Sequence, residues 1–289
     1  MFLIGENFLL AVVFYGGLLW LAGIALAVMV VITLLYGYTW FDRSEIKGNR
    51  SWAALRSWRC CRRYQRCYGH RVIVDPDAFT ETRVVPCIYA ASPHGVNAVS
   101  YIATFLIQRG DHVRLFSPNG LRCGVWSGMF WPILLRELAL ALGCVSVREK
   151  ALRKQLFKLK RDVAIIPGGM WEIAPPDDFI PKAQPGFLRI AWEAQGNVDC
   201  AHVYHHGEEE NYCTIGRNWW IRKWLIRRLG ATLTFYAGAF CHHPLTTFIS
   251  TRHRWRDGES FDDFCQRWRT DDMAHRARWL RGMQEKKET

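Results

Sequence analysis

Charged side chains are absent from residues 7–40 of this 289-residue sequence, which contain no Asp, Glu, Lys or Arg. No basic segment precedes this stretch, and it is longer than the apolar part of a signal peptide, so a cleavable signal is excluded. One upright transmembrane helix needs about 20 residues. The uncharged stretch therefore indicates a membrane segment, either one tilted span or a tight helical hairpin. We expect the hairpin, with both ends in the cytoplasm.

The sequence also lacks internal repeats and low-complexity tracts, and its ten cysteines have no regular spacing. Irregular spacing excludes a small scaffold held together by disulfides, and several of the cysteines lie within apolar runs, where cysteine packs as a small hydrophobic residue. We therefore expect the main domain to face a reducing compartment. Since 50% of the residues are hydrophobic, the chain has enough apolar material for a large core.

Positive charge is in excess, with 38 Lys and Arg against 26 Asp and Glu. This excess indicates an anionic partner, which could be nucleic acid, anionic lipid or a phosphorylated small molecule. Arginines and tryptophans alternate through residues 41–72, directly after the membrane segment. That position favours anionic lipid headgroups and a cytoplasmic location for this side, and we expect no nucleic-acid partner.

From residue 84 onward, short β-prone stretches alternate with helical patterns. Strands are predicted near 85–89, 114–117, 144–147, 163–166, 198–204, 231–238 and 245–250, and helices at 96–108, 130–142, 149–160 and 186–195. This alternation predicts an α/β sheet with helices on both faces. We divide the chain into a membrane hairpin or span (1–40), a basic bridge (41–72), a main domain (73–256) and a charged C-terminal helix (257–289).

Three polar stretches follow predicted strands, at 92–95 (SPHG), 167–172 (PGGMWE) and 203–212 (VYHHGEEENY). In open α/β sheets, ligands bind at the carboxyl ends of strands. His94 is a candidate general base, which takes the proton from an attacking hydroxyl. The backbone near Gly168 and Gly169 can approach an oxyanion or a phosphate, and Glu172 could orient His94 or bind an acceptor. Together these groups are the parts that acyl transfer needs.

The predicted helix 130–142 is apolar around most of its circumference, with Arg136 and Glu137 as interruptions. Such a helix is buried either in a protein core or in lipid. In the first case its two charges reach the surface. In the second, which we favour, the helix lies against the bilayer and walls an acyl path, with both charges near His94.

Three further groups are candidate ligand sites. Arg148 and the basic helix 149–160 are candidates to meet phosphates. Cys60, Cys61, Cys67 and His70 match no known zinc spacing. The histidines of the 203–212 stretch stand beside Glu208 and Glu210, which more simply form a polar wall of the site. We therefore expect no metal.

The order of these motifs resembles the diacylglycerol acyltransferase type 2 family, which includes monoacylglycerol and wax-alcohol acyltransferases. The matching segments are SPHG (92–95) for the family's HPHG, 130–149 for its PFLRE helix, 165–172 for its GG-x-x-E block, PGFLRIAWEAQ (185–195), VYHHGEEENY (203–212), HHPLTTFIS (242–250) and the tail 273–283 with His275. The resemblance covers most of the chain, and this many motifs in one order are specific.

The resemblance implies a glycerolipid-acyltransferase-like mixed sheet flanked by helices, preceded by a membrane hairpin. It implies transfer of a fatty acyl chain from acyl-CoA, a co-substrate, to a neutral-lipid hydroxyl, with no cofactor. Diacylglycerol is the first-ranked acceptor, and monoacylglycerol or a fatty alcohol are the others. It also implies a location in the endoplasmic reticulum membrane with the domain in the cytoplasm, and lipid droplets as a second location. The oligomeric state stays open, a homo-oligomer included.

By position in these motifs, His94 and Glu172 are the expected catalytic residues. The expected contacts to acyl-CoA or acceptor are Pro93, Gly95, Asn97, Arg136, Glu137, Arg148, Gly168, Gly169, Glu208 and Glu210.

Two departures from the family pattern support a rival function. Ser92 replaces the first histidine of the motif, and the sequence STRHRW (250–255) stands where the family has G-x-P. The rival is a catalytically silent lipid-binding or scaffold protein. The H-x-x-x-x-D motif of related glycerolipid enzymes is also absent, because Val99 takes the place of the aspartate. A glycerophosphate or lysophospholipid acceptor is therefore less expected.

Overall fold

The chain divides into two compact units, Met1–Ser44 and Glu45–Thr289, in a computed structural model. The residues that it describes are 2–56, 58–79, 85–92, 98–108, 111–169, 186–211, 213–215, 224, 235–237 and 243–288.

The first unit contains one continuous helix, α1 (Phe2–Phe41), where we expected a hairpin. Its segment Gly16–Leu34 has a mean hydropathy of 2.5 and is the one candidate span in the described part of the chain, judged by length and composition. The hairpin prediction is therefore wrong, and the single-span alternative agrees with the structure. No proline interrupts the segment, and Gly16, Gly17 and Gly23 each cost only about 1 kcal/mol of helix propensity.

The second unit is built on a seven-stranded sheet with the strand order β1-β9-β6-β2-β5-β3-β4. The strands are β1 (Arg71–Val74), β2 (Cys87–Ser92), β3 (Leu121–Val125), β4 (Cys144–Ser146), β5 (Asp162–Ile165), β6 (Asp199–His206) and β9 (Thr246–His253). Neighbouring strands are parallel except β6 and β9, which are antiparallel. A separate antiparallel pair joins β7 (Cys213–Ile215) to β8 (Phe235–Ala237). The prediction of a mixed sheet is confirmed.

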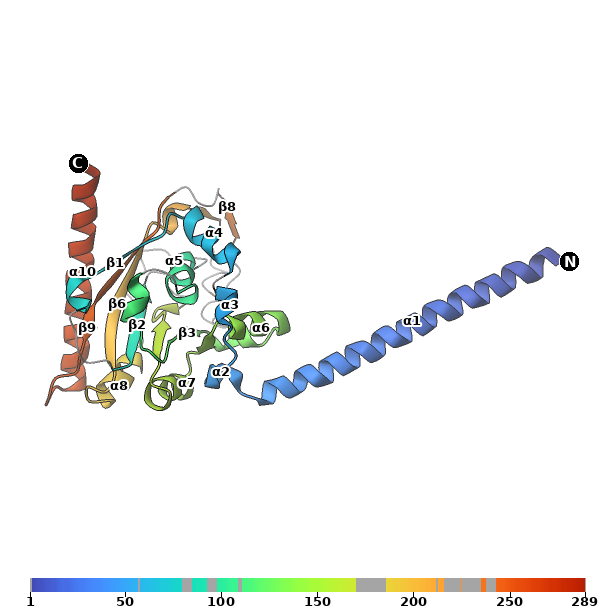
Figure 1. Cartoon of the computed structure of the whole chain (residues 1–289), viewed down its shortest axis with the longest axis horizontal. Helices are drawn as coiled ribbons and strands as arrows, with labels where there is room; N and C mark the ends of the chain where they lie inside the picture. Colours follow the sequence, from blue (N-terminus) through green and yellow to red (C-terminus); the bar gives the residue numbers. More distant parts are fainter. Residues whose placement is uncertain are drawn as a thin grey trace. The chain divides into compact units, whose positions relative to one another are not determined.

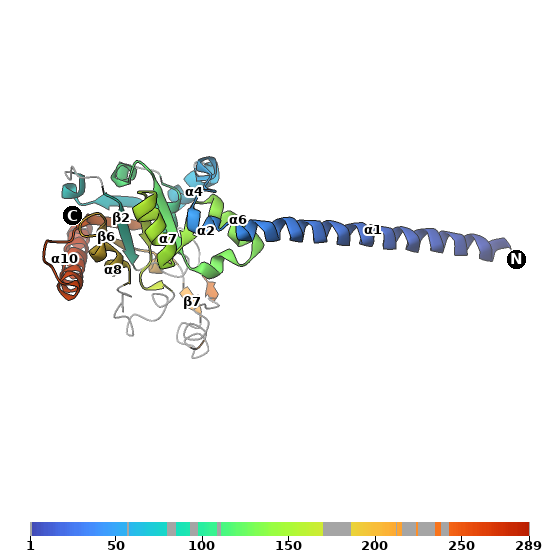
Figure 2. The ribbon, with the colours of Figure 1, turned by 90° about the horizontal axis from the view of Figure 1, so that it is seen from below.

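Helices cover both faces of this sheet (Figures 1 and 2). The α-helices of this unit, with α2 beginning at the unit boundary, are α2 (Ser44–Lys47), α3 (Ala53–Arg56), α4 (Arg59–Cys67), α5 (Val99–Tyr101), α6 (Ile133–Ala141), α7 (Glu149–Arg153), α8 (Gly186–Glu193) and α10 (Phe261–Glu288). Two of them continue as π-helical turns, α5 into Ile102–Leu106 and α7 into Lys154–Lys158. Short 3₁₀ turns lie at Pro76–Phe79, Asp111–Leu115, Ser127–Phe130 and Glu209–Asn211.

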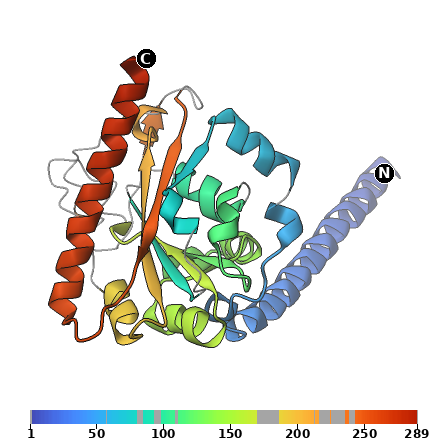
Figure 3. The same cartoon turned by 60° about the vertical axis from the view of Figure 1, so that its left-hand side comes forward.

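Side-chain alternation along β2 divides the core into two layers. Cys87, Tyr89 and Ala91 face the layer that includes the helix beginning at α5, together with part of α6. Ile88 and Ala90 face the layer that contains α8 and residues of α7 and α10. All six residues of β2 are buried, as expected for a central strand covered on both sides. Figure 3 shows α10 running along the strands β6 and β9.

Some predicted elements differ from the observed ones. The strand expected at 114–117 is wrong, because Asp111–Leu115 forms a 3₁₀ helix that turns Leu115 and Phe116 into the core. The strands β1 and β3 were not predicted: β1 begins within the last two residues of the basic bridge, and β3 contains Arg122 and Gly124 among its five residues. The helix expected at 130–142 begins only after Pro132, which is extended and serves as its N-cap.

A buried carboxylate with two arginine partners fixes the start of β6. The carboxylate of Asp199 is fully buried and accepts hydrogen bonds from Nε and Nη2 of Arg254, at 3.0 and 2.8 Å. Arg252 Nη1 lies 3.9 Å from the same carboxylate. A buried carboxylate that loses its principal cation is left with an uncompensated desolvation cost.

We expect Arg254→Ala to lower the free energy of unfolding by about 3 kcal/mol or more, because Asp199 would keep only its more distant arginine. The matched control is Arg256→Ala, two residues away and exposed, which should change stability by less than about 0.5 kcal/mol. Chemical denaturation of the full chain in detergent measures both. Equal stability of the two variants would contradict this account of the β6 terminus.

Candidate functional site

The three polar stretches singled out in the sequence follow neighbouring parallel strands. β2 lies between β6 and β5, with Ser92 opposite Tyr204 and Ala90 opposite Ile165. Their carboxyl ends therefore meet at one edge of the sheet, which is where open α/β sheets bind ligands. Pro93, His94, Gly95, Asn97 and Glu172 lie outside the described residues. Ser92 and Ala98, the residues on either side of 93–97, are described.

Glu208 binds the residues that follow this segment. Its buried carboxylate accepts hydrogen bonds from the backbone N–H groups of Val99 and Ser100, at 2.9 and 3.1 Å. Both N–H groups belong to the first turn of α5, where backbone donors lack helical partners and a negative charge is favourable. The sequence placed Glu208 among the substrate contacts, and the structure gives it a capping contact to α5.

Gly207 makes this contact possible. Its φ is +89°, and a Cβ atom there would lie 2.7 Å from the carbonyl oxygen of Pro244. Only glycine combines that backbone conformation with such a close approach. The turn after β6 thereby directs Glu208 toward α5.

Arg276 of α10 binds the residue that precedes the segment. Its Nη2 donates a hydrogen bond to Ser92 Oγ at 2.6 Å, and its guanidinium also pairs with Asp272 at 3.0 Å. Asp272 in turn lies 3.2 Å from Nδ1 of His202 on β6. Neither Arg276 nor Asp272 was identified from the sequence, although their i, i+4 spacing on a predicted helix is a signal for such a pair.

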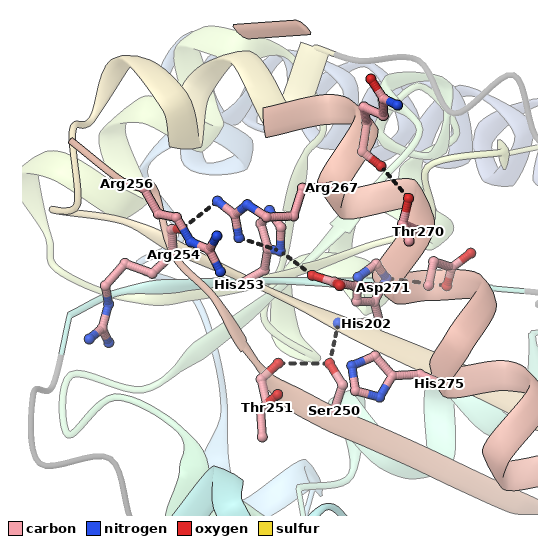
Figure 4. A network of polar contacts seen from close by, with 12 residues as sticks. His202, Ser250, Thr251, His253, Arg254, Arg256, Arg267, Thr270, Asp271 and His275 are labelled. Atoms are coloured by element: carbon pink, nitrogen blue, oxygen red, sulfur yellow. Dashed lines mark hydrogen bonds and ion pairs between the residues drawn. The ribbon is translucent and has the colours of Figure 1, made fainter. Parts of the chain in front are cut away.

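A buried histidine network lies between β6, β9 and α10 (Figure 4). His202 stacks on Trp268 with 3.4 Å between ring centroids, and Nδ1 of His253 lies 3.0 Å from a carboxylate oxygen of Asp271. Burial lowers the pKa of His202, and burial with the nearby Arg267 lowers the pKa of His253 to about 4. Both imidazoles are therefore neutral at pH 7 and act here as packed, hydrogen-bonding groups.

The glycines that follow β5 form a turn. The N–H of Gly169 donates to the carbonyl oxygen of Ile166 at 3.1 Å, and Gly169 has a φ of +51°. Gly168 and Gly169 are both partly exposed. This turn follows the carboxyl end of β5, at the same sheet edge as Ser92.

The predicted substrate contacts on α6 pair with α2 and with the segment that follows it. Arg136 is only 1% exposed, and its Nη2 lies 3.6 Å from Oε2 of Glu45. Glu137 accepts two hydrogen bonds from Arg50, one of them 3.2 Å long.

The other two predicted contacts lie on the surface. Arg148 is exposed at the N-cap of α7. Glu210 makes a half-exposed ion pair with His243 at 3.4 Å.

The exposed face of α6 is apolar. Leu134 is 84% exposed and Leu138 50% exposed, and Ile133 and Leu135 are exposed beside them. The same surface is extended by other exposed apolar side chains, Trp126, Met129, Trp131 and Val147. We call these eight residues the apolar face. The alternative in which α6 is a core helix with surface charges is therefore wrong, because the leucines face outward and Arg136 is buried.

No group of three His, Cys, Asp or Glu side chains among the described residues is arranged to hold a metal ion.

Comparison with known proteins gives one family and two relatives. The sequence profile described as diacylglycerol acyltransferase matches residues 19–252. A cattle (Bos taurus) protein named diacylglycerol O-acyltransferase 2-like protein 6 is 24% identical over 245 residues, covering 77% of this chain and 71% of that protein. The mouse (Mus musculus) protein of the same name is 21% identical over 199 residues, covering 67% of this chain and 58% of that protein. The chain thus spans under two thirds of the mouse relative. No solved structure matches it significantly.

We expect Glu208→Gln to lower the free energy of unfolding by about 1–3 kcal/mol, because an amide cannot accept both hydrogen bonds from α5 and its NH₂ would face a backbone donor. Glu210→Gln loses only a half-exposed ion pair and should cost less than about 1 kcal/mol. Thermal unfolding of the two variants, matched in charge, separates these outcomes. A greater loss of stability in Glu210→Gln than in Glu208→Gln would contradict the capping role of Glu208.

Proposed function

The chain belongs to the diacylglycerol acyltransferase family, and on that premise we propose that it is a membrane O-acyltransferase. It would move a fatty acyl chain from acyl-CoA to the hydroxyl of a neutral lipid, with diacylglycerol as the first acceptor and monoacylglycerol or a fatty alcohol as the others. The main support is the meeting of β6, β2 and β5 at one sheet edge, with Ser92 bound by Arg276 and Val99 bound by Glu208.

In this proposal His94 is the general base. Its imidazole takes the proton from the acceptor hydroxyl as the oxygen attacks the thioester carbonyl of acyl-CoA. The tetrahedral intermediate then collapses, the C–S bond breaks, and the CoA thiolate leaves and receives the proton from His94. Glu172 would orient His94 or bind the acceptor. No acyl-enzyme is required, since both substrates react in one ternary complex.

The contacts on either side of the segment explain how such a base could be kept in position. Arg276 holds Ser92 before the segment, and Glu208 holds Val99 and Ser100 after it. A general base must stay within hydrogen-bonding reach of the proton that it takes, so a fixed loop lowers the cost of reaching that geometry. Arg276 and Glu208 are therefore positioning residues in this proposal.

The membrane side of the proposal rests on α1 and the apolar face. The helix α1 is long and apolar enough to cross a bilayer. Large exposed apolar patches mark interaction sites, and tryptophan favours the membrane–water boundary. We propose that the apolar face contacts the bilayer and borders the path of the acyl chain, with the second unit on the cytoplasmic side of the endoplasmic reticulum or on lipid droplets.

The rival function is lipid binding or scaffolding without catalysis. Ser92 is compatible with either function, because its hydroxyl is occupied by Arg276. Formation of labelled product from radiolabelled oleoyl-CoA and a panel of neutral acceptors, in membranes that contain the full chain, distinguishes the two. Product above empty membranes supports the enzyme, and its absence with every acceptor favours the rival.

We expect His94→Ala to lower kcat about 100- to 10,000-fold, the usual contribution of a general base. Membrane insertion and CoA binding should be unchanged, because the flanking contacts at Ser92 and Val99 do not involve the imidazole. Turnover of labelled oleoyl-CoA and equilibrium binding of CoA measure the two properties on the same preparation. Activity within threefold of wild type would exclude His94 as the base.

We expect Leu134→Gln combined with Leu138→Gln to lower activity toward bilayer-embedded diacylglycerol at least about fivefold while the unfolding temperature stays the same, because both side chains are exposed. The control is Leu280→Gln, an exposed leucine on α10. Assay in nanodiscs compares the variants. Unchanged activity of the double variant would mean that the apolar face does not serve the acyl path.

A further inference from the structure

A cleft lined by arginines lies beside α4, a helix of the basic bridge. It has a volume of about 760 Å³ and is lined in part by Arg62, Arg66, Arg71, His70, His112 and Asp111. A second hollow of about 480 Å³ is lined by Arg59, Arg62, Arg63 and Arg66. Since Arg62 and Arg66 line both, the two hollows adjoin each other along α4. We call them together the α4 cleft.

The positive charge of this cleft is not balanced by nearby acids. In the described ranges, none of its five arginines has a carboxylate within ion-pair distance. The only acidic side chain lining it, among the residues the structure describes, is Asp111, which lies 3.8 Å from Arg114. Like charges this close repel one another, so an arrangement of several unpaired arginines favours an anion between them.

The histidines of the cleft add no charge at neutral pH. Burial, with a smaller effect of the neighbouring His112, lowers the pKa of His70 to about 4. Burial also lowers the pKa of His112. The neutral imidazole of His70 contacts the hydroxyls of Thr104 and Thr247 at 3.2 and 3.0 Å. Recognition of an anion would therefore depend on the guanidinium groups, which stay charged and match phosphate oxygens in two-pronged hydrogen bonds.

We propose that the α4 cleft is a phosphate-binding site that holds the phosphorylated nucleotide end of acyl-CoA. The inference rests on the proposed function for the identity of this ligand. The larger of the two hollows, at about 760 Å³, lies in the range of small-molecule sites, which measure roughly 300–1,000 Å³. A layer of lipid headgroups is the other source of phosphate near a membrane segment, and the experiment below distinguishes it from a nucleotide.

The cleft is joined directly to the helix that follows the segment 93–97. Gln65 Nε2 of α4 donates to the carbonyl oxygen of Ala103 at 2.8 Å, and Tyr68 packs with Val99 in a small buried cluster. Val99 is also one of the two residues whose N–H groups bind Glu208. A nucleotide in the cleft would therefore be bound next to the same helix that carries the candidate catalytic segment at its N-terminus.

One of the phosphate contacts that the sequence suggested is less available than these arginines. On the helix that begins at α7, Arg153 already pairs with Glu149 at 2.6 Å and with Glu193. Its guanidinium is thus neutralised by two carboxylates, whereas Arg62 and Arg66 have none in the part of the chain that the structure describes.

The test compares two charge-matched double variants of the full chain in nanodiscs of phosphatidylcholine. Arg62→Gln with Arg66→Gln changes the cleft, and Arg269→Gln with Arg281→Gln removes the same charge from exposed positions on α10. The probes are CoA and 3′-dephospho-CoA, measured by equilibrium binding. We expect the cleft variant to bind CoA about tenfold or more weakly, because it loses charge-assisted hydrogen bonds, and to discriminate less against dephospho-CoA. The α10 control should stay within about twofold of wild type.

Equal CoA affinity in the cleft variant and the control would overturn the proposal. So would a cleft variant that binds CoA normally but loses its preference for discs containing phosphatidylserine, because the arginines would then serve the membrane surface. If the cleft variant unfolds, Arg59→Gln with Arg63→Gln, on exposed positions of the same helix, is tested against the same prediction. CoA binding is measured without turnover. An inactive chain that still binds CoA through these arginines would therefore contradict the proposed enzymatic function but not the phosphate-binding cleft.

Discussion

The two hydrogen bonds that Glu208 accepts from α5 tie together the strand ends on which the candidate site depends. They join the turn after β6 to the helix after β2 and so fix where the chain leaves the segment 93–97. Because the carboxylate is buried, moving it away without a new partner would be costly. The same helix then supports α4 and its arginines. The candidate base and the proposed nucleotide cleft therefore share one anchored element.

Periodicity and composition predicted the central part of this fold. The apolar runs at 163–166 and 198–204 became β5 and β6, and the polar stretches after them reached the same edge as Ser92. Strand order is set by long-range pairing, which local patterns do not contain. The capping of α5 by Glu208 and the contact of Arg276 with Ser92 were missed for the same reason, since each joins residues that are about 110 to 180 positions apart.

The orientation of helix α6 could not be predicted from its residue types alone. The sequence indicated an apolar helix, but in the structure three of its leucines are exposed and its arginine is buried. Arg136 is buried because Glu45 supplies a carboxylate next to its guanidinium, whereas the leucines need no partner if lipid covers them. Which side of such a helix faces inward depends on the position of one distant acid, and neither hydropathy nor spacing reports that position.

The C-terminal helix α10 determines where a stable fragment of this protein can end. The family match ends at residue 252, and the sequence alone set the tail apart from residue 257 onward. Yet Phe264 and Trp268 of α10 lie in the same core layer as β2, and Arg276 reaches Ser92. A fragment that ends at residue 252 would expose that core layer to water. It would also lose the contact of Arg276 with Ser92, the residue just before the segment 93–97. Expression of the domain by itself should therefore retain the chain through α10.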